Sequence, residues 1–322
     1  MILWGLDRPL EIAEIDPTLP SEGEVFVRLR AAALNKRDYW VTKGKYPGLV
    51  FPLVLGSDGA GVVDGREVII NPGLDWGSDP DQFSPDFRIL GMPDFGTLSD
   101  LVKVPEINLY DKPKHLSWTE AAAFPLCGVT AYRAMFTRGR AKPGEKMLIT
   151  GIGGGVASMA MLFGIASGMD VWVTSSSDYK LDQAVLHGAS GGANYSRHTW
   201  DKELAEKIDG KFDLVIDGAG GTDFSKIVHM MHPRGRIVIY GGTRGNIEQL
   251  SPQRIFWKQL DILGSTMGSP DDFSLMVDMV IKYEIKPIIS HTFSLMEAND
   301  ALAVIAEGDQ FGKVCIDIPD QW

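Results

Sequence analysis

Cysteine, positive charge and long apolar runs are all scarce in this chain of 322 residues. The two cysteines, Cys127 and Cys315, exclude both a disulfide framework and a four-cysteine zinc lobe. The formal net charge of -11 argues against general affinity for nucleic acid or acidic membranes, so an anionic ligand must be held by local donors. No apolar run approaches the length of a membrane span, and the first residues, MILWGLDRPLEI, do not resemble a secretory signal. We therefore expect a protein of the reducing cytoplasm that binds neither nucleic acid nor a membrane.

Histidine gives no metal or catalytic pattern either. The six histidines are His115, His187, His198, His229, His232 and His291. None stands at a spacing typical of a metal site or a catalytic triad, so none is assigned a role. A hydrophobic content of 44% and a charged content of 23% are ordinary for a soluble globular enzyme, and the length predicts two domains.

The most informative stretch runs from Lys146 to Ala157 and has the sequence KMLITGIGGGVA. A short apolar run over residues 147–150 predicts a buried parallel strand, and a helix is predicted from Val156 onward. The turn between them contains Gly151, Gly153, Gly154 and Gly155. A strand, a glycine turn and a helix in this order aim backbone N–H groups and a helix N-terminus at a pyrophosphate, and a Cβ atom would block that approach. We interpret the stretch as a dinucleotide-binding turn in preference to an incidental glycine-rich loop.

The pattern of predicted elements changes along the chain. Residues 1 to about 110 predict short strands with frequent turns, and a loop rich in Gly, Pro, Ser and Asp over residues 71–87 is interpreted as a surface excursion. Ser117 and Glu120 have the spacing of a helix capping box. From there to about residue 266 apolar strands alternate with helices, which predicts a parallel, doubly wound sheet. The strands are predicted at residues 146–150, 170–175, 212–218, 235–242 and 261–266. A helix follows near residues 273–283, and a terminal strand is expected to rejoin the first domain.

The order of these parts resembles the medium-chain dehydrogenase/reductase superfamily, and the resemblance covers essentially the whole chain. It is carried by ALNKRDYWVTKGKYP, FPLVLGSDGAGVV, AAAFPLCGVTAYRAMF, the glycine turn, VTSSSDYK, GANY and FGKV. It implies an α/β protein with a GroES-like β-rich catalytic domain over residues 1–121, completed by residues 269–322, and a Rossmann NADP-binding domain over residues 122–268. Within the superfamily the chain looks most like the quinone oxidoreductase and enoyl reductase branch, which lacks zinc.

The residues at the zinc-ligand places of this fold favour the zinc-free branch. A catalytic zinc takes three protein ligands, and by resemblance these places hold Asn35, Ser57 and Cys127, with Asp58 following the second. An amide and a neutral hydroxyl are poor zinc donors beside imidazole and thiolate. One good ligand does not make a zinc site, so we interpret Cys127 as a small buried residue at a packed helix start and expect no metal.

The second strand of the Rossmann domain ends in VTSSSDYK, which bears on the choice of cofactor. An NAD-specific site places an acidic residue at this tip, where it accepts from the ribose 2′-OH. Here Thr174, Ser175 and Ser176 stand at the tip with Lys180 one helical turn later, and small hydroxyls with a cation suit a 2′-phosphate. Asp178 conflicts with this interpretation, but it lies beyond the tip and is expected to cap the helix. We expect NADPH rather than NADH; a solvated serine turn is the alternative.

The resemblance assigns further residues to the cofactor site. They are Thr130, Val156, Tyr195, Gly241, Gly242, Ser265 and Thr266. Arg244 is either a second cation near the cofactor or a surface charge.

The resemblance also places Asn35 and Tyr46 where related reductases contact substrate or supply a proton. A tyrosine hydroxyl can donate both a hydrogen bond and a proton, although an ordinary loop aromatic would give the same match. Asp38 is expected to orient neighbouring backbone, and Tyr39 and Trp40 to belong to a cleft wall or the core. These features suit an NADPH-dependent enzyme that transfers hydride to a quinone or an α,β-unsaturated carbonyl compound. The alternatives are a zinc-type alcohol dehydrogenase or aldehyde reductase, and a non-catalytic NADPH-binding sensor.

A homodimer is expected by analogy, through an exposed edge of the Rossmann sheet at residues 235–242 or the neighbouring strand. Substrate specificity is expected to depend on the loops at residues 71–87 and 269–273.

Overall fold

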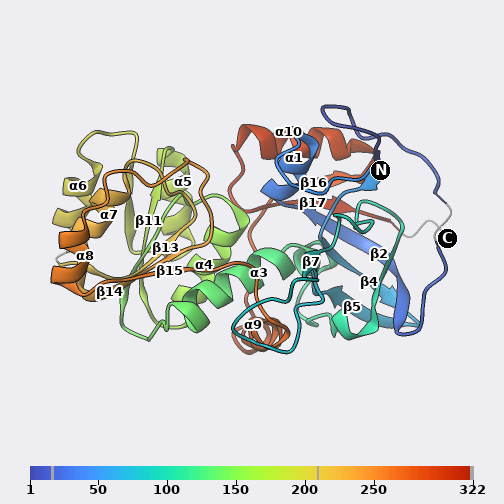
Figure 1. The fold of residues 1–322 in the computed structure, drawn as a ribbon, viewed down its shortest axis with the longest axis horizontal. Coiled ribbons are helices and arrows are strands. Elements are labelled where there is room, and N and C mark those ends of the chain that lie inside the picture. Colours follow the sequence, from blue (N-terminus) through green and yellow to red (C-terminus); the bar gives the residue numbers. More distant parts are fainter. Residues whose placement is uncertain (16–17, 209, 320–322) are drawn as a thin grey trace. The chain divides into compact units, whose positions relative to one another are not determined.

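The structure of the protein, a computed structural model, describes residues 1–15, 18–208 and 210–319. The described chain forms two compact units: unit 1 is Met1–Val129 with the residues from Gly268 onward, and unit 2 is Thr130–Met267 (Figure 1). The sequence places the first boundary after residue 121, eight residues earlier. The difference arises because helix α3 (Pro125–Tyr132) begins in unit 1, where the Leu126 N–H donates to Asp58 Oδ1 at 2.7 Å.

Unit 1 is built on a seven-stranded sheet in the order β16-β17-β2-β4-β5-β9, with β8 paired to β2. Its strands are β2 (Glu24–Leu34), β4 (Asp58–Val63), β5 (Arg66–Ile70), β8 (Leu101–Pro105), β9 (Leu109–Asp111), β16 (Ile289–Ser294) and β17 (Lys313–Asp317). Two short antiparallel pairs are β1 (Ile2–Leu3) with β3 (Leu53–Val54) and β6 (Gly73–Leu74) with β7 (Arg88–Ile89). Its helices are α1 (Lys36–Thr42), α2 (Trp118–Ala122), α9 (Pro270–Lys282) and α10 (Ala298–Glu307), with 3-10 turns η1 (Glu106–Asn108) and η3 (Leu295–Glu297).

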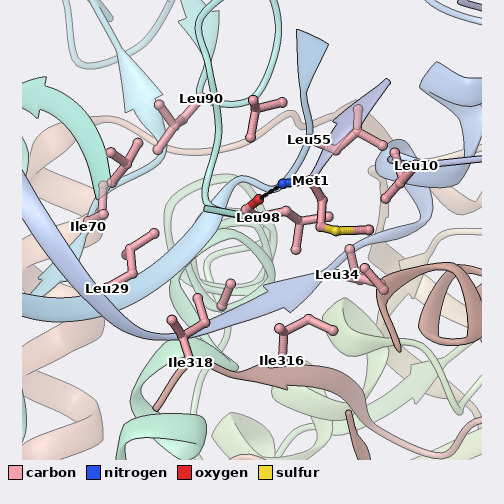
Figure 2. Close-up of a cluster of buried hydrophobic side chains, with 14 of the residues drawn as sticks. Met1, Leu10, Leu29, Leu34, Leu55, Ile70, Leu90, Leu98, Ile316 and Ile318 are labelled. Atoms are coloured by element: carbon pink, nitrogen blue, oxygen red, sulfur yellow. Dashed lines mark hydrogen bonds between the residues drawn. The ribbon is translucent and has the colours of Figure 1, made fainter. Parts of the chain in front are cut away.

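The terminal strand β17 pairs antiparallel with β2, which confirms that the C-terminal part of the chain rejoins the first domain. Figure 2 shows the aliphatic cluster on which this pairing rests, with Leu34 of β2 and Ile316 of β17 among its buried members. The Met1 ammonium lies in the same cluster and donates to the Leu98 carbonyl at 2.8 Å. The paired residues 31–34 and 314–316 are buried on both faces of the sheet, and a shift of one residue in either strand would exchange the side chains of the two faces.

Side chains at helix starts define two helices of unit 1. Ser117 and Glu120 form the predicted capping box of α2, in which the Ser117 N–H donates to Glu120 Oε2 at 2.7 Å and the Glu120 N–H to Ser117 Oγ at 3.2 Å. Ser269 and Asp272 form the same arrangement at α9. This cap explains why α9 begins at Pro270, three residues before the predicted start.

Unit 2 is a six-stranded parallel sheet in the order β12-β11-β10-β13-β14-β15. Its strands are β10 (Lys146–Ile149), β11 (Asp170–Ser175), β12 (Gly191–Asn194), β13 (Phe212–Asp217), β14 (Met231–Ile239) and β15 (Asp261–Gly264). Its helices, which flank the strands in Figure 1, are α4 (Gly155–Ala166), α5 (Asp178–Leu186), α6 (Trp200–Lys207), α7 (Phe224–His229) and α8 (Pro252–Lys258), after a π-helical segment η2 (Arg133–Arg138). This is the predicted doubly wound sheet.

The strand order of unit 2 reverses between β10 and β13, which places a topological switch point at their carboxyl ends. Of the two strands considered as an exposed edge, β14 lies inside the sheet and β15 forms the edge. Across the described part of the chain, no helix combines the length and apolar character that crossing a bilayer requires.

Candidate active site

The glycine turn after β10 is tied to the neighbouring strand β11. The Gly151 N–H donates to Thr174 Oγ1 at 3.2 Å, and the Ile152 N–H to the Thr174 carbonyl at 2.8 Å. Gly154 precedes the first residue of α4, and no side chain caps this helix, so its first N–H groups are available to a ligand. The Cβ positions of Gly151 and Gly154 have no heavy atom within 4 Å and face open space. Backbone donors, a helix N-terminus and open space on the glycine α-carbons fit the pyrophosphate of a dinucleotide.

A buried polar link joins the two strands at the switch point. Thr150 Oγ1 donates to Asp217 Oδ1 at 2.5 Å and accepts from the Gly218 N–H at 3.2 Å. Asp217 Oδ2 also accepts from the Gly220 N–H at 3.0 Å, so one carboxylate shapes the turn after β13. Ligands of doubly wound sheets bind beyond the carboxyl ends of the strands at this point.

The tip of β11 is organised by its serines. Ser175 Oγ accepts from the Ser177 N–H at 3.2 Å, and Ser177 is the N-cap of α5. The expectation that Asp178 caps this helix is therefore wrong, because Ser177 occupies the cap and Asp178 lies one residue inside. The Asp178 carboxylate instead accepts from Asn194 Nδ2 at 3.0 Å and from Arg197 Nη2 at 3.1 Å. The hydrogen bond from Asn194, together with the Arg197 charge, lowers the pKa of Asp178.

The other residues assigned to the cofactor also lie at the carboxyl ends of the strands of unit 2. The Tyr195 N–H donates to the Ser175 carbonyl at 2.9 Å, which brings Tyr195 beside the tip of β11. The Arg244 guanidinium lies 4.6 Å from the centroid of the Tyr195 ring and pairs with Asp223 at 2.9 Å. Ser265 follows β15, and its buried Oγ has no hydrogen-bond partner among the described residues. The remaining assigned positions are Thr130 in α3, which contacts Met267 Sδ at 3.8 Å, Gly153 in the turn, Gly155 and Val156 at the start of α4, Ser176 at the tip, Lys180 in α5, Gly241 and Gly242 after β14, and Thr266 after β15.

In unit 1 a lysine bonds to Asn35, at one of the expected metal-ligand places, and to Asp58, which follows another. Lys313 Nζ donates to Asn35 Oδ1 at 2.7 Å and to Asp58 Oδ2 at 2.8 Å, and Asn35 Nδ2 donates to the same Asp58 oxygen at 2.8 Å. The register of β17 with β2 brings Lys313 beside Asn35, which follows the last residue of β2. Lys313 is 3% exposed and Asp58 is fully buried. The Asn35 and Asp58 oxygens therefore bind the Lys313 ammonium as their cation.

Burial and charge set the protonation of this cluster. Burial opposes the charged form of Lys313, but the charge and hydrogen bond of Asp58, together with the electrostatic effects of Cys127 and Cys315, raise the pKa of Lys313. Burial raises the pKa of both cysteine thiols, Cys127 and Cys315, to about 12. Both thiols are therefore protonated at neutral pH in the metal-free protein. The described residues contain no group of three or more His, Cys, Asp or Glu side chains that could hold a metal ion.

Asp38 orients backbone, as expected. Its Oδ2 accepts from the Asn35 N–H at 2.7 Å and its Oδ1 from the Gly56 N–H at 3.2 Å. Burial raises the pKa of Asp38 in spite of the neighbouring Arg37 charge. The carboxylate therefore links the start of α1 to the segment that carries Ser57 and Asp58.

Tyr46 lies against the guanidinium of Arg37. The Arg37 Cζ atom is 5.5 Å from the centroid of the Tyr46 ring. Arg37 Nη1 donates to Ser57 Oγ at 2.8 Å, and Ser57 Oγ donates to the Leu90 carbonyl at 2.7 Å. The structure therefore brings Asn35, Tyr46 and Ser57 into one connected polar region of unit 1, joined through Arg37 and Asp58.

Sequence reasoning did not single out Lys313, Arg37 or Asp217 as site residues. Lys313 and Arg37 stand in the quoted motifs FGKV and ALNKRD, but nothing local to those motifs reveals their partners. Asp217 ends an apolar strand, and that position at the carboxyl end of a parallel strand is a usable signal.

A doubly wound sheet with a glycine turn at its switch point, in a chain whose other unit is β-rich and carries a buried polar cluster, defines a dinucleotide-dependent dehydrogenase or reductase. Two family descriptions match this chain: the alcohol dehydrogenase GroES-like domain over residues 21–114, and the zinc-binding dehydrogenase over residues 152–282. The chain is 38% identical over 340 residues to the zinc-type alcohol dehydrogenase-like protein YogA of Leptosphaeria maculans, and the match covers 96% of this chain and 95% of that protein.

Solved structures of dehydrogenases and reductases have the same fold as this chain. A crystal structure of an NAD-dependent alcohol dehydrogenase has a TM-score of 0.93 at 35% identity, and the match covers 99% of both chains. The quinone oxidoreductase of Thermus thermophilus, whose structures include a complex with NADPH, has a TM-score of 0.82 at 27% identity, and the match covers 98% of this chain and 99% of that one. The chain belongs to the medium-chain dehydrogenase/reductase superfamily and is an oxidoreductase with a GroES-like domain and a Rossmann domain.

Proposed function

We propose that this oxidoreductase is a zinc-independent, NADPH-dependent reductase of quinones or α,β-unsaturated carbonyl compounds. The single observation that carries the proposal is the position of the Lys313 ammonium. It donates hydrogen bonds to the Asn35 and Asp58 oxygens, whose lone pairs would otherwise be available to a metal. An ammonium within hydrogen-bond distance of these oxygens repels a divalent cation, and the remaining donors are an amide, a hydroxyl and protonated thiols.

The preference for NADPH rests on the tip of β11. Ser176 is exposed there, the hydroxyls of Ser175 and Ser177 order the turn, and the carboxylate of Asp178 is paired with Arg197 at 3.1 Å. A paired carboxylate repels a 2′-phosphate less than a free one would. The names of the relatives point both ways, since one structural neighbour is called NAD-dependent and another binds NADPH.

The residues of this chain would prepare the site for hydride transfer. The bound nicotinamide nucleotide supplies the hydride, and the glycine turn and the strand tips hold it through backbone N–H groups and hydroxyls. Asn35 has one remaining amide hydrogen, since Nδ2 donates only to Asp58 among the described residues, and this hydrogen can orient a substrate oxygen. Tyr46 forms no hydrogen bond with a described residue, so its hydroxyl is available to deliver a proton to the oxygen that becomes negative.

The proposal is tested by following NADPH oxidation by the purified protein with a quinone, an enone or an aldehyde as acceptor, with and without a chelator. We expect oxidation with the quinone or the enone, unaffected by the chelator and slower with NADH. Metal analysis of the same preparation should find less than one zinc ion per chain. Tyr46→Phe, which keeps the ring and removes the hydroxyl, should lower kcat by about 100-fold and leave NADPH affinity unchanged.

Other outcomes favour the alternatives. Activity confined to the aldehyde and lost with chelator would identify a zinc-type alcohol dehydrogenase, in line with the name of the fungal relative. Tight NADPH binding without oxidation of any acceptor would favour a sensor.

A further inference from the structure

The guanidinium of Arg37 is buried but only partly used. Arg37 lies in α1 with 7% of its surface exposed. Its Nη1 donates to Ser57 Oγ at 2.8 Å and to the Leu90 carbonyl at 3.0 Å. Its Nε is buried and has no hydrogen-bond partner among the described residues. Leaving a buried charged donor unpaired is costly, so such a group calls for an explanation, and a ligand that completes its hydrogen bonding is one.

The contacts of Arg37 fix the direction of its unused edge. The Nη1 bonds hold one corner of the planar group, and Cζ lies over the Tyr46 ring, 5.5 Å from its centroid. Nε and Nη2 lie on the remaining edge, and their N–H bonds run nearly parallel. This fork matches the two oxygens of a carboxylate and is the geometry in which arginine binds carboxylates bidentately.

No neighbouring acid of the cluster pairs with this edge. Asp58 accepts from Lys313, Asn35 and the Leu126 N–H. Asp38 accepts from backbone N–H groups at both of its oxygens. In the described part of the chain neither carboxylate forms a hydrogen bond with Arg37, although the Asp38 carboxylate is near enough to interact with its charge. The hydrogen-bonding capacity of the Nε/Nη2 edge is therefore unused beside the candidate proton donor Tyr46.

We propose that the Nε/Nη2 edge of Arg37 binds a carboxylate of the substrate, so that the preferred acceptors are quinones or enones that carry a carboxyl group. The reaction named here rests on the proposed function, but binding of the carboxylate does not require turnover. Arg37 would hold the acid at one end of the substrate while the adjacent Tyr46 hydroxyl serves the reacting oxygen.

Binding is tested with benzoate and its uncharged analogue benzamide, titrated calorimetrically into the intact protein saturated with NADP+. The wild type should bind benzoate tighter than benzamide by about tenfold or more. Arg37→Met should abolish that preference, and Arg37→Lys, which keeps the charge without the fork, should retain part of it. Arg66→Met is the matched control, because Arg66 is a surface residue paired with Asp111, and it should behave as the wild type.

Turnover is tested with 3-benzoylacrylate and its methyl ester under NADPH oxidation. Arg37→Met should raise KM for the acid by about tenfold and leave KM for the ester unchanged, a split that a merely structural role would not produce. Equal affinity of the wild type for benzoate and benzamide, or an equal loss of both in Arg37→Met, would overturn the assignment. Selective benzoate binding without oxidation of either enone would support the Arg37 site and count against the proposed reaction.

Discussion

Lys313 and Asp58 form the buried ion pair of the polar cluster in unit 1. They form an ion pair of 2.8 Å whose side chains are 4% and 0% exposed. The net contribution of such a buried pair to stability is small, because each ion loses its hydration. Removal of one partner is far more costly, because the other remains buried with its charge uncompensated.

We expect Lys313→Met to lower the free energy of unfolding by about 3–5 kcal/mol, since it leaves the Asp58 carboxylate unpaired. The measurement is urea denaturation at neutral pH, followed by circular dichroism. The double variant Lys313→Met with Asp58→Asn removes both charges and should recover part of the loss. A single variant as stable as the wild type would contradict the charged pair.

The pH dependence of the same variants gives an independent check. The pKa of Lys313 is raised above its ordinary 10.5 in the folded protein, so the pair's contribution is fully present below that value. It is lost as the pH rises through the folded-state pKa of Lys313. The wild type should therefore lose stability above pH 10.5 more steeply than the double variant does. Near neutral pH, Lys313 should not contribute to the dependence of the free energy of unfolding on pH.

At the scale of elements, the glycine turn between β10 and α4 determines where a nucleotide can bind. Gly151 has a φ of 67°, which is strained for any residue with a Cβ, and its Cβ position faces open space. Gly168, after α4, has a φ of 73° and the same open surroundings, but it lies at the opposite end of the helix from the turn, beyond its C-terminus. A comparison of alanine substitutions at the two glycines therefore distinguishes the effect of backbone strain from the effect of lost ligand contact.

We expect Gly151→Ala and Gly168→Ala each to cost about 1 kcal/mol of stability, because alanine is strained at positive φ. Only Gly151→Ala should weaken NADPH binding, by about tenfold, because its methyl group would occupy the space of the pyrophosphate. Thermal unfolding measures the first effect and a fluorescence titration with NADPH the second. Equal NADPH affinity in both variants would argue against the turn as the phosphate site.

Features that depend on neighbouring residues could be predicted from the sequence, whereas features that depend on long-range contacts could not. The strand, turn and helix around Gly151 follow from residues within one short stretch, so composition and spacing identify them. The capping box at Ser117 is local in the same way. Lys313 is 255 positions from Asp58 in the sequence and 278 positions from Asn35. Only the register of β17 with β2 brings these residues together. Sequence spacing carries no information about such a register. The motifs therefore identified the residues at the metal-ligand places, but not the Lys313 ammonium that bonds to Asn35 and Asp58.

At the scale of the whole molecule, the terminal strand makes unit 1 depend on both ends of the described chain. β17 lies between β16 and β2, and Ile316 of β17 belongs to the same buried cluster as Met1 (Figure 2). Lys313 begins this strand, so the polar cluster cannot form until the chain from Gly268 onward has returned to unit 1. Folding of the candidate site is therefore a property of the long-range topology of unit 1, whereas the glycine turn belongs to unit 2 alone.

The free edge of unit 2 is where we expect a second copy of the chain to bind. β15 is one of the two edge strands of the sheet, β12 being the other, and on the preceding helix α8 Phe256 and Trp257 are 58% and 80% exposed. An unpaired strand edge near exposed aromatic side chains favours association. We expect β15 to pair with β15 of a second copy about a two-fold axis, which would cover the strand edge and the aromatic side chains.

We expect the wild type to be a dimer in sedimentation experiments. The Ser265 N–H donates to β14, so by strand alternation the Ile262 N–H points to the free edge. Ile262→Pro removes that donor without breaking the bonds to β14 and should produce monomers, whereas the control Ile262→Val keeps the N–H and should remain dimeric. A monomeric wild type, or a dimer that withstands the proline, would place the interface elsewhere or exclude it.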